Sequence, residues 1–184
     1  MRKIYCLVLL LLMCGSLYST NAFAKVSKTE AKQDSLPVPK GMMFYVQRDP
    51  NANTVIYELN KTAQGSLDEN EPIHPFWIRY AEGGEHKELN YIQRKFAYGL
   101  NTKKLGKDSY ELKFVCYSKL ALYLRKGNDG AYHVLCKINN REAVLDRIFV
   151  RIEGGTFWVP NVLYVELKGR DAATGKMVTE RFKP

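Results

Sequence analysis

Apolar and polar side chains alternate along most of the chain from residue 41 to residue 184, and this period of two is typical of half-buried β-strands. The first two alternating sets lie on either side of the sequence DPNAN, whose proline, aspartate and asparagines favour a turn. They are Met42, Phe44 and Val46 before the turn, and Val55, Tyr57 and Leu59 after it. The pattern therefore predicts two neighbouring strands joined by a tight connection.

The longest alternating set begins at Tyr110 and keeps one phase as far as Leu124, which predicts one long strand or two collinear strands. The turn-forming sequence KGNDGA follows this set, and the alternation then resumes as a hairpin partner. The apolar residues of the partner are Tyr132, Val134, Cys136 and Ile138.

Two further features lie in the C-terminal third of the chain. In EAVLDRIFVRI, Leu145 departs from the parity that Val144 shares with Ile148, which predicts a β-bulge near Asp146 and Arg147. The segments VLYVELKG and MVTERF lie on either side of DAATGK, whose aspartate and glycine favour a hairpin turn.

Only one segment has a helical period. Leu89, Ile92 and Phe96 recur at i, i+3 and i+7 as a core stripe, and Gly99 favours the end of the helix. One helix among about eight strands predicts a mainly β fold, either an antiparallel β-sandwich or a partly closed barrel with one packed α-helix. The alternative is an α+β sheet wrapped on that single helix.

The N-terminus has the order of a secretory signal peptide: a short basic start, an apolar run and an A-x-A site that ends at Ala24. The apolar run is too short for a transmembrane anchor, which needs about 20 residues. Lipidation at Cys14 is an alternative that Met13 disfavours. We expect a signal peptide over 1–24, a disordered leader over 25–40 and a single β-rich domain over 41–184.

Cleavage removes Arg2 and Lys3 and no acidic residue, so it lowers the formal net charge of +9 by only two. An exported basic chain meets anionic envelope polymers and polyanionic sugars rather than nucleic acid. The charge therefore favours an envelope glycan or another anionic ligand as a partner and gives no support for nucleic acid. The alternative is a cationic surface that serves solubility alone.

The chain lacks the sequence motifs of common catalytic and cofactor sites. It has no phosphate-binding glycine loop and no G-x-S-x-G motif, and His74, His86 and His133 are too scattered for metal-ligand spacing. We therefore expect no catalytic residues, no cofactor and no metal. A glycosidase-like carboxylate pair stays open as an alternative. Its candidates are Glu58, Asp146 and Glu166.

The mature chain keeps Cys116 and Cys136, which an oxidising compartment would allow to form a disulfide. If the hairpin pairs Arg125 with Ala131, Cys136 lies opposite Leu120. Cys116 is then about 13 Å away, beyond the reach of roughly 7 Å between the Cα atoms of a disulfide. We expect two thiols, unless the chain bends sharply at residues 118–119.

The stretch HPFWIRYAEGG is the most suggestive candidate for a site. Strand parity assigns His74, Phe76, Ile78 and Tyr80 to the core face and Trp77 and Arg79 to the opposite face. The helix adds a second stripe, and together the two predict an aromatic and basic groove for a sugar or an anion. The candidate ligand-binding residues are Trp77, Arg79, Tyr91, Arg94 and Tyr98. The alternative is that Trp77 is packed by the helix and that the arginines are solvated or pair with Glu85 and Glu88.

Four segments, FYVQRDPNANTVIYELN, GSLDENEPIHPFWIRYAEGGEHKELNYIQRKFAYGL, LDRIFVRI and YVELKGRDAATGK, resemble a family of secreted Bacteroidetes proteins, domain of unknown function 4833. The resemblance covers nearly all of residues 41–184. It implies a single exported domain, and it brings no catalytic residues with it.

These observations favour an exported, non-catalytic envelope binding or interaction module for carbohydrate or an anionic envelope component. One alternative is a small hydrolase that acts on envelope glycans, which would show two carboxylates in a deep cleft. Another is a structural accessory subunit, which would show a large exposed apolar patch.

The first prediction concerns export. Secretion should remove residues 1–24 and leave a chain that begins at Lys25, because Ala22 and Ala24 satisfy the cleavage rule. N-terminal sequencing and the intact mass of the exported protein measure this. A lipid-modified Cys14 would contradict it.

Overall fold

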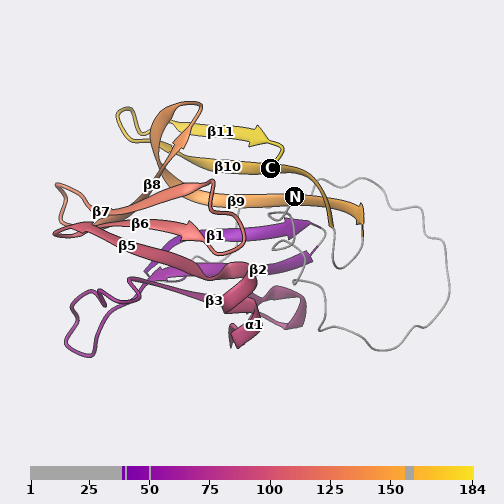
Figure 1. Ribbon diagram of the computed structural model, residues 1–184, viewed down its shortest axis with the longest axis horizontal. Helices are drawn as coiled ribbons and strands as arrows, with labels where there is room; N and C mark the ends of the chain where they lie inside the picture. The colour runs from indigo at the N-terminus through magenta and orange to yellow at the C-terminus, as the bar shows by residue number, and fades with distance from the viewer. Residues whose placement is uncertain (1–38, 40, 50, 156–159) are drawn as a thin grey trace.

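The computed structural model describes residues 39, 41–49, 51–155 and 160–184. The predicted signal peptide and, Pro39 excepted, the predicted leader lie outside the described residues. The described part is mainly β, and its sheet curls into an open half-barrel (Figure 1). The predicted fold class, in its partly closed barrel form, is confirmed.

The described residues form eleven strands rather than about eight. They are β1 (Met42–Asp49), β2 (Asn51–Leu59), β3 (Ile73–Arg79), β4 (Glu85–Glu88), β5 (Leu100–Gly106), β6 (Ser109–Phe114), β7 (Ala121–Lys126), β8 (Tyr132–Ile138), β9 (Arg141–Gly155), β10 (Pro160–Asp171) and β11 (Met177–Phe182). Three short helical turns accompany them: η2 (Tyr80–Glu82), α1 (Tyr91–Gln93) and η3 (Arg94–Tyr98), the last a turn of π-helix.

Nine strands follow one another in the order β4-β3-β2-β1-β9-β8-β7-β6-β5, and β10 and β11 extend the sheet from β9. β10 pairs with β9 along nearly its whole length. β8 pairs with the first residues of β9, and β1 pairs with residues 147–151. Because β10 occupies one edge of β9, β8 and β1 share the other edge, one after the other. Two wings of four strands therefore diverge from β9 and enclose the core between them (Figure 1).

The predicted β-bulge is confirmed at the point where the wings diverge. Lys168 of β10 pairs with Arg147, whereas the next residue, Gly169, pairs with Leu145, so Asp146 is the extra residue. The bulge changes the parity of β9, and both Leu145 before it and Ile148 after it are buried in the core.

The core between the wings is built around an aromatic cluster. The rings of Phe44 and Tyr57 stack at 4.4 Å, and Phe114 of the opposite wing meets both edge-on, at 6.3 and 5.7 Å. The hydroxyl of Tyr57 donates a hydrogen bond of 2.9 Å to the backbone carbonyl of Tyr98. That bond satisfies a buried phenol and ties the helical turn to the sheet.

The predicted hairpins β1–β2, β7–β8 and β10–β11 are confirmed. Two details differ from the predictions. Arg125 pairs with His133 rather than with Ala131, and β1 and β9 are parallel in a sheet that is otherwise antiparallel. The first difference leaves the inward-facing set of β8 unchanged, because a shift of two residues keeps strand parity.

The predicted long strand from Tyr110 to Leu124 was wrong. The chain turns back after Phe114, and β6 and β7 form an antiparallel hairpin in which Leu112 pairs with Leu122. Parity could not reveal the turn, because paired residues face the same side of the sheet and the alternation keeps its phase across the connection.

The helix begins later and turns differently than the sequence suggested. Asn90 caps it, because the Asn90 side chain accepts a hydrogen bond from the Gln93 backbone while the Gln93 side chain accepts one from Asn90. Of the expected core stripe, Leu89 is buried in the core, although it precedes the cap. Ile92 and Phe96 are exposed, and the π-turn places Ala97 and Tyr98 inward instead.

The assignment of the core face of β3 was also wrong. Ile73 is buried in the central core and Trp77 packs against it, whereas Phe76 packs on the other face against the His86 ring at 4.3 Å. Both faces of this strand carry large rings, so parity alone could not choose between them.

A second prediction follows from Gly99, the residue after the π-turn. A Cβ atom at Gly99 would overlap the backbone carbonyl oxygen of Arg94. Replacement with alanine should therefore lower the free energy of unfolding by about 1–3 kcal/mol, as overpacking does. Urea unfolding measures this change. Gly106→Ala is the matched control, because a Cβ there meets nothing within 4 Å; equal losses in both variants would contradict the steric explanation.

A third prediction concerns Cys116 and Cys136, the two cysteines of the described residues, neither of which forms a disulfide. Cys136 is buried, and burial raises the pKa of its thiol to about 12, so it stays protonated at neutral pH. Cys116 is half-buried. In the chain that begins at Lys25, N-ethylmaleimide should modify two thiols after denaturation but Cys116 alone in the native protein. Mass spectrometry of the labelled peptides decides this, and a denatured chain without thiols would contradict it.

Candidate functional site

An apolar cavity of about 100 Å³ lies at the end of the core next to the helical turn. β1 contributes Val46 and Arg48 to its lining, and Ala97 and Tyr98 of η3 contribute one wall. The remaining wall residues come from the β6–β7 connection and from β9, β10 and β11. They include Cys116, Tyr117, Leu120, Val150, Val165 and Phe182.

Strand parity explains why this lining is apolar. Phe44 and Val46 alternate inward along β1, and Arg48 follows in the same phase. On β9, Ile148, Val150 and Ile152 all line the cavity. They can do so only because the bulge at Asp146 shifts the parity of the strand.

Among the described residues of this lining, Arg48 has the only charged side chain. Among the described residues, its guanidinium forms no ion pair with a carboxylate. Burial raises the pKa of the Tyr98 phenol, and the positive charge of Arg48 lies close enough to oppose that rise in part. An apolar chamber thus has one cation in its wall, and this cation can contact an anionic group of a ligand.

The structure separates the five predicted ligand-binding residues. Trp77 and Tyr98 meet edge-to-face at 4.9 Å, so the tryptophan supports the cavity wall from behind. Arg79 pairs with Glu82 at 2.5 Å, and Arg94 pairs with Glu71 and Glu88. Tyr91 is 70% exposed and accepts a hydrogen bond of 2.7 Å from Lys95.

The contact between Trp77 and Tyr98 matches the alternative in which the helical segment packs the tryptophan, and the arginines are ion-paired as that alternative expected. Of the two expected partners, Glu88 does pair with an arginine, Arg94, whereas Arg79 pairs with Glu82 instead of Glu85. Ligand binding by the five residues stays a prediction.

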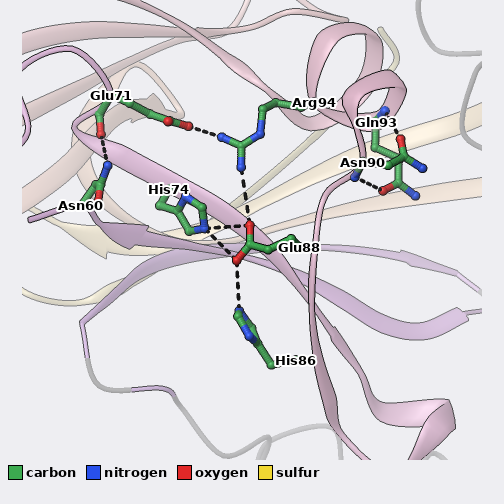
Figure 2. Close-up of polar contacts among 8 residues, drawn as sticks. All are labelled: Asn60, Glu71, His74, His86, Glu88, Asn90, Gln93 and Arg94. Carbon is green, nitrogen blue, oxygen red and sulfur yellow. Dashed lines mark hydrogen bonds and ion pairs between the residues drawn. The ribbon is translucent and has the colours of Figure 1, made fainter.

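Arg94 belongs to an ionic cluster around Glu88, which Figure 2 shows. The Glu88 carboxylate lies 3.0 Å from the ring nitrogen of His74, 3.7 Å from that of His86 and 3.5 Å from Arg94. Arg94 also bonds to Glu71. The cluster connects β3, β4, the β2–β3 connection and η3 at the surface. Each such exposed pair is worth about 0–1 kcal/mol, so the cluster mainly fixes the position of the turn that carries the cavity wall.

A wider hollow lies on the opposite side of the core, and its lining mixes polar and apolar residues in about equal parts. It contains Glu58, Glu69 and Asp108. Asp108 accepts a hydrogen bond of 2.5 Å from Tyr132, and Glu69 accepts one of 2.5 Å from Lys104. Two of the three carboxylates are thus already satisfied within the protein.

The other two acids proposed for a hydrolase are ion-paired as well. Asp146 lies 2.8 Å from Arg170, and Glu166 lies 2.6 Å from Arg181. Within the described ranges, no cluster of three or more histidine, cysteine or acidic side chains is arranged to hold a metal ion. In the same part of the chain, no helix has the length and apolar character needed to cross a membrane.

Sequence reasoning missed Arg48 as a site residue. The signal was present, because Arg48 continues the inward phase of Phe44 and Val46, where a charge is unexpected. The rest of the cavity had no such signal. Its walls come from segments far apart in the chain, and only the folded wings bring them together.

No curated protein and no solved structure matches the chain. One family model does, over residues 44–181, which is more than half of the chain. The chain therefore belongs to the family described as Domain of unknown function (DUF4833).

Proposed function

We infer that the chain is an exported, non-catalytic binding module for an amphiphile that has an apolar part and an anionic group. The observation that supports this most directly is the apolar cavity, in which Arg48 has the single charged side chain among the described lining residues. Pockets of this kind bind ligands through apolar burial, and one polar contact fixes the orientation.

The chemistry of the lining favours an amphiphile over the other expected ligands. A sugar placed there would lose the hydration of its hydroxyl groups without gaining enough hydrogen bonds. A small inorganic anion would leave the apolar walls unused. An alkyl or prenyl group with a carboxylate or phosphate satisfies both the walls and the Arg48 guanidinium. This inference narrows the anionic envelope component expected from the sequence.

The glycan-directed hydrolase has weaker support. Asp146 and Glu166 each form an ion pair with an arginine, so both carboxylates already have a partner within the protein. The accessory subunit also has weaker support, because the apolar cavity lies inside the half-barrel and the exposed apolar side chains beside it, Tyr91, Ile92 and Phe96, come from one short segment.

The fourth prediction tests the role of Arg48. The protein should bind a medium-chain carboxylate more tightly than the alcohol of equal chain length, because only the carboxylate gains a charge-assisted bond. Arg48→Gln should weaken carboxylate binding about 10- to 100-fold, corresponding to roughly 1.5–3 kcal/mol, and should change alcohol binding little. Isothermal titration calorimetry measures both affinities.

Arg141→Gln is the matched control, because Arg141 is an exposed residue at the opposite end of β9 from the cavity. Cys116 provides an independent readout, since it lines the cavity and a bound chain should protect it from N-ethylmaleimide. The proposal fails if neither amphiphile binds, or if carboxylate and alcohol bind equally and Arg48→Gln changes neither.

A further inference from the structure

An exposed apolar segment lies directly beside the cavity. Among the described residues, six large hydrophobic side chains are at least 36% exposed, and three of them lie within residues 91–96. Tyr91 is 70%, Ile92 49% and Phe96 36% exposed. The next two residues, Ala97 and Tyr98, are buried and line the cavity, so one short segment carries both the exposed set and part of the cavity wall.

Cations accompany the aromatic rings of this surface. The ammonium of Lys95 lies 5.1 Å from the centre of the Tyr91 ring and 5.5 Å from that of Phe96. A second such pair lies in the β6–β7 connection, where the Lys119 ammonium is 5.9 Å from the Tyr117 ring. Tyr117 lines the cavity, so this second pair borders it, and the first pair belongs to the segment that continues into the cavity wall at Ala97.

All charged side chains of the helical segment, residues 90–99, are positive. No acidic residue occurs from Asn90 to Gly99, and Arg94 has its charge balanced by Glu71 and Glu88. Lys95 has no carboxylate partner among the described residues, so its charge is available to an external anion. Amphipathic surfaces with aromatic rings, an aliphatic side chain and lysine are typical of proteins that bind at the boundary between lipid headgroups and acyl chains.

We propose that Tyr91, Ile92, Lys95 and Phe96, here called the rim patch, dock on a lipid bilayer with anionic headgroups. This inference rests on the proposed function, because it names the source of the amphiphile: a membrane leaflet from which the ligand enters the adjacent cavity. Ile92 and Phe96 insert among the acyl chains, and Lys95 contacts a headgroup phosphate. Lys119 makes the same type of contact on the far side of the cavity.

Vesicle co-sedimentation provides the test. The exported protein should bind vesicles of phosphatidylcholine mixed with phosphatidylglycerol and should bind pure phosphatidylcholine vesicles at least several-fold more weakly. Ile92→Asn should weaken binding to the mixed vesicles about tenfold, because it removes apolar burial. Lys95→Glu should weaken it about tenfold as well, because it reverses a charge at the anionic surface.

Two control variants match these substitutions. Leu105→Asn removes a side chain with the same 49% exposure as Ile92, and Lys107→Glu reverses an exposed charge. Both residues lie at the end of β5 away from the helical turn, near the β5–β6 connection (Figure 1). Both controls should bind the mixed vesicles as the parent protein does.

The inference is overturned if the parent protein does not co-sediment with the mixed vesicles, or if the controls lose binding as much as the rim-patch variants. Its failure is distinguishable from failure of the proposed function. Calorimetry with the soluble carboxylate tests the cavity alone, and the rim-patch variants should bind that carboxylate with unchanged affinity while they lose vesicle binding.

Discussion

β9 pairs with two different strands along one of its edges, and the rest of the architecture depends on that constraint. β10 occupies one edge of β9, which leaves β8 and β1 to share the other. The extra residue at Asp146 lies between their two pairing sites and lets both halves of β9 direct apolar side chains inward. Without this change of parity, either Leu145 or Ile148 would face away from the core. If Ile148 faced away, Val150 would face away with it, because the two residues share strand parity, and the cavity would lose both.

The helical turn that closes the cavity is too short to be stable alone, so its surroundings determine its position. The Tyr57 hydroxyl holds the Tyr98 carbonyl, Trp77 packs on the Tyr98 ring, and the Glu88 cluster holds Arg94 from outside. The first two contacts hold the π-turn from the core side, and the third holds it from the surface. They explain how a segment with an exposed apolar surface keeps a defined conformation.

Strand parity predicted much of the fold and little of the site. It located the hairpins and the bulge, because Leu145 visibly breaks a period that Ile148 resumes. It could not distinguish one long strand from the hairpin of β6 and β7, since Leu112 and Leu122 pair and so keep the same phase. The helical stripe failed after Leu89 because a cap at Asn90 and a π-turn change the period locally. The cavity depends on how the wings close, and no local pattern encodes that.

The parallel pairing of β1 with β9 joins the two ends of the domain, since Tyr45 lies beside Arg147. The other strand pairs connect neighbours in the chain and can form as local hairpins. Closing the long loop between β1 and β9 has a large entropic cost, which the core contacts offset only once both wings exist. We therefore expect the β1–β9 junction to form late in folding, and the half-barrel to be assembled from two preformed meanders rather than strand by strand.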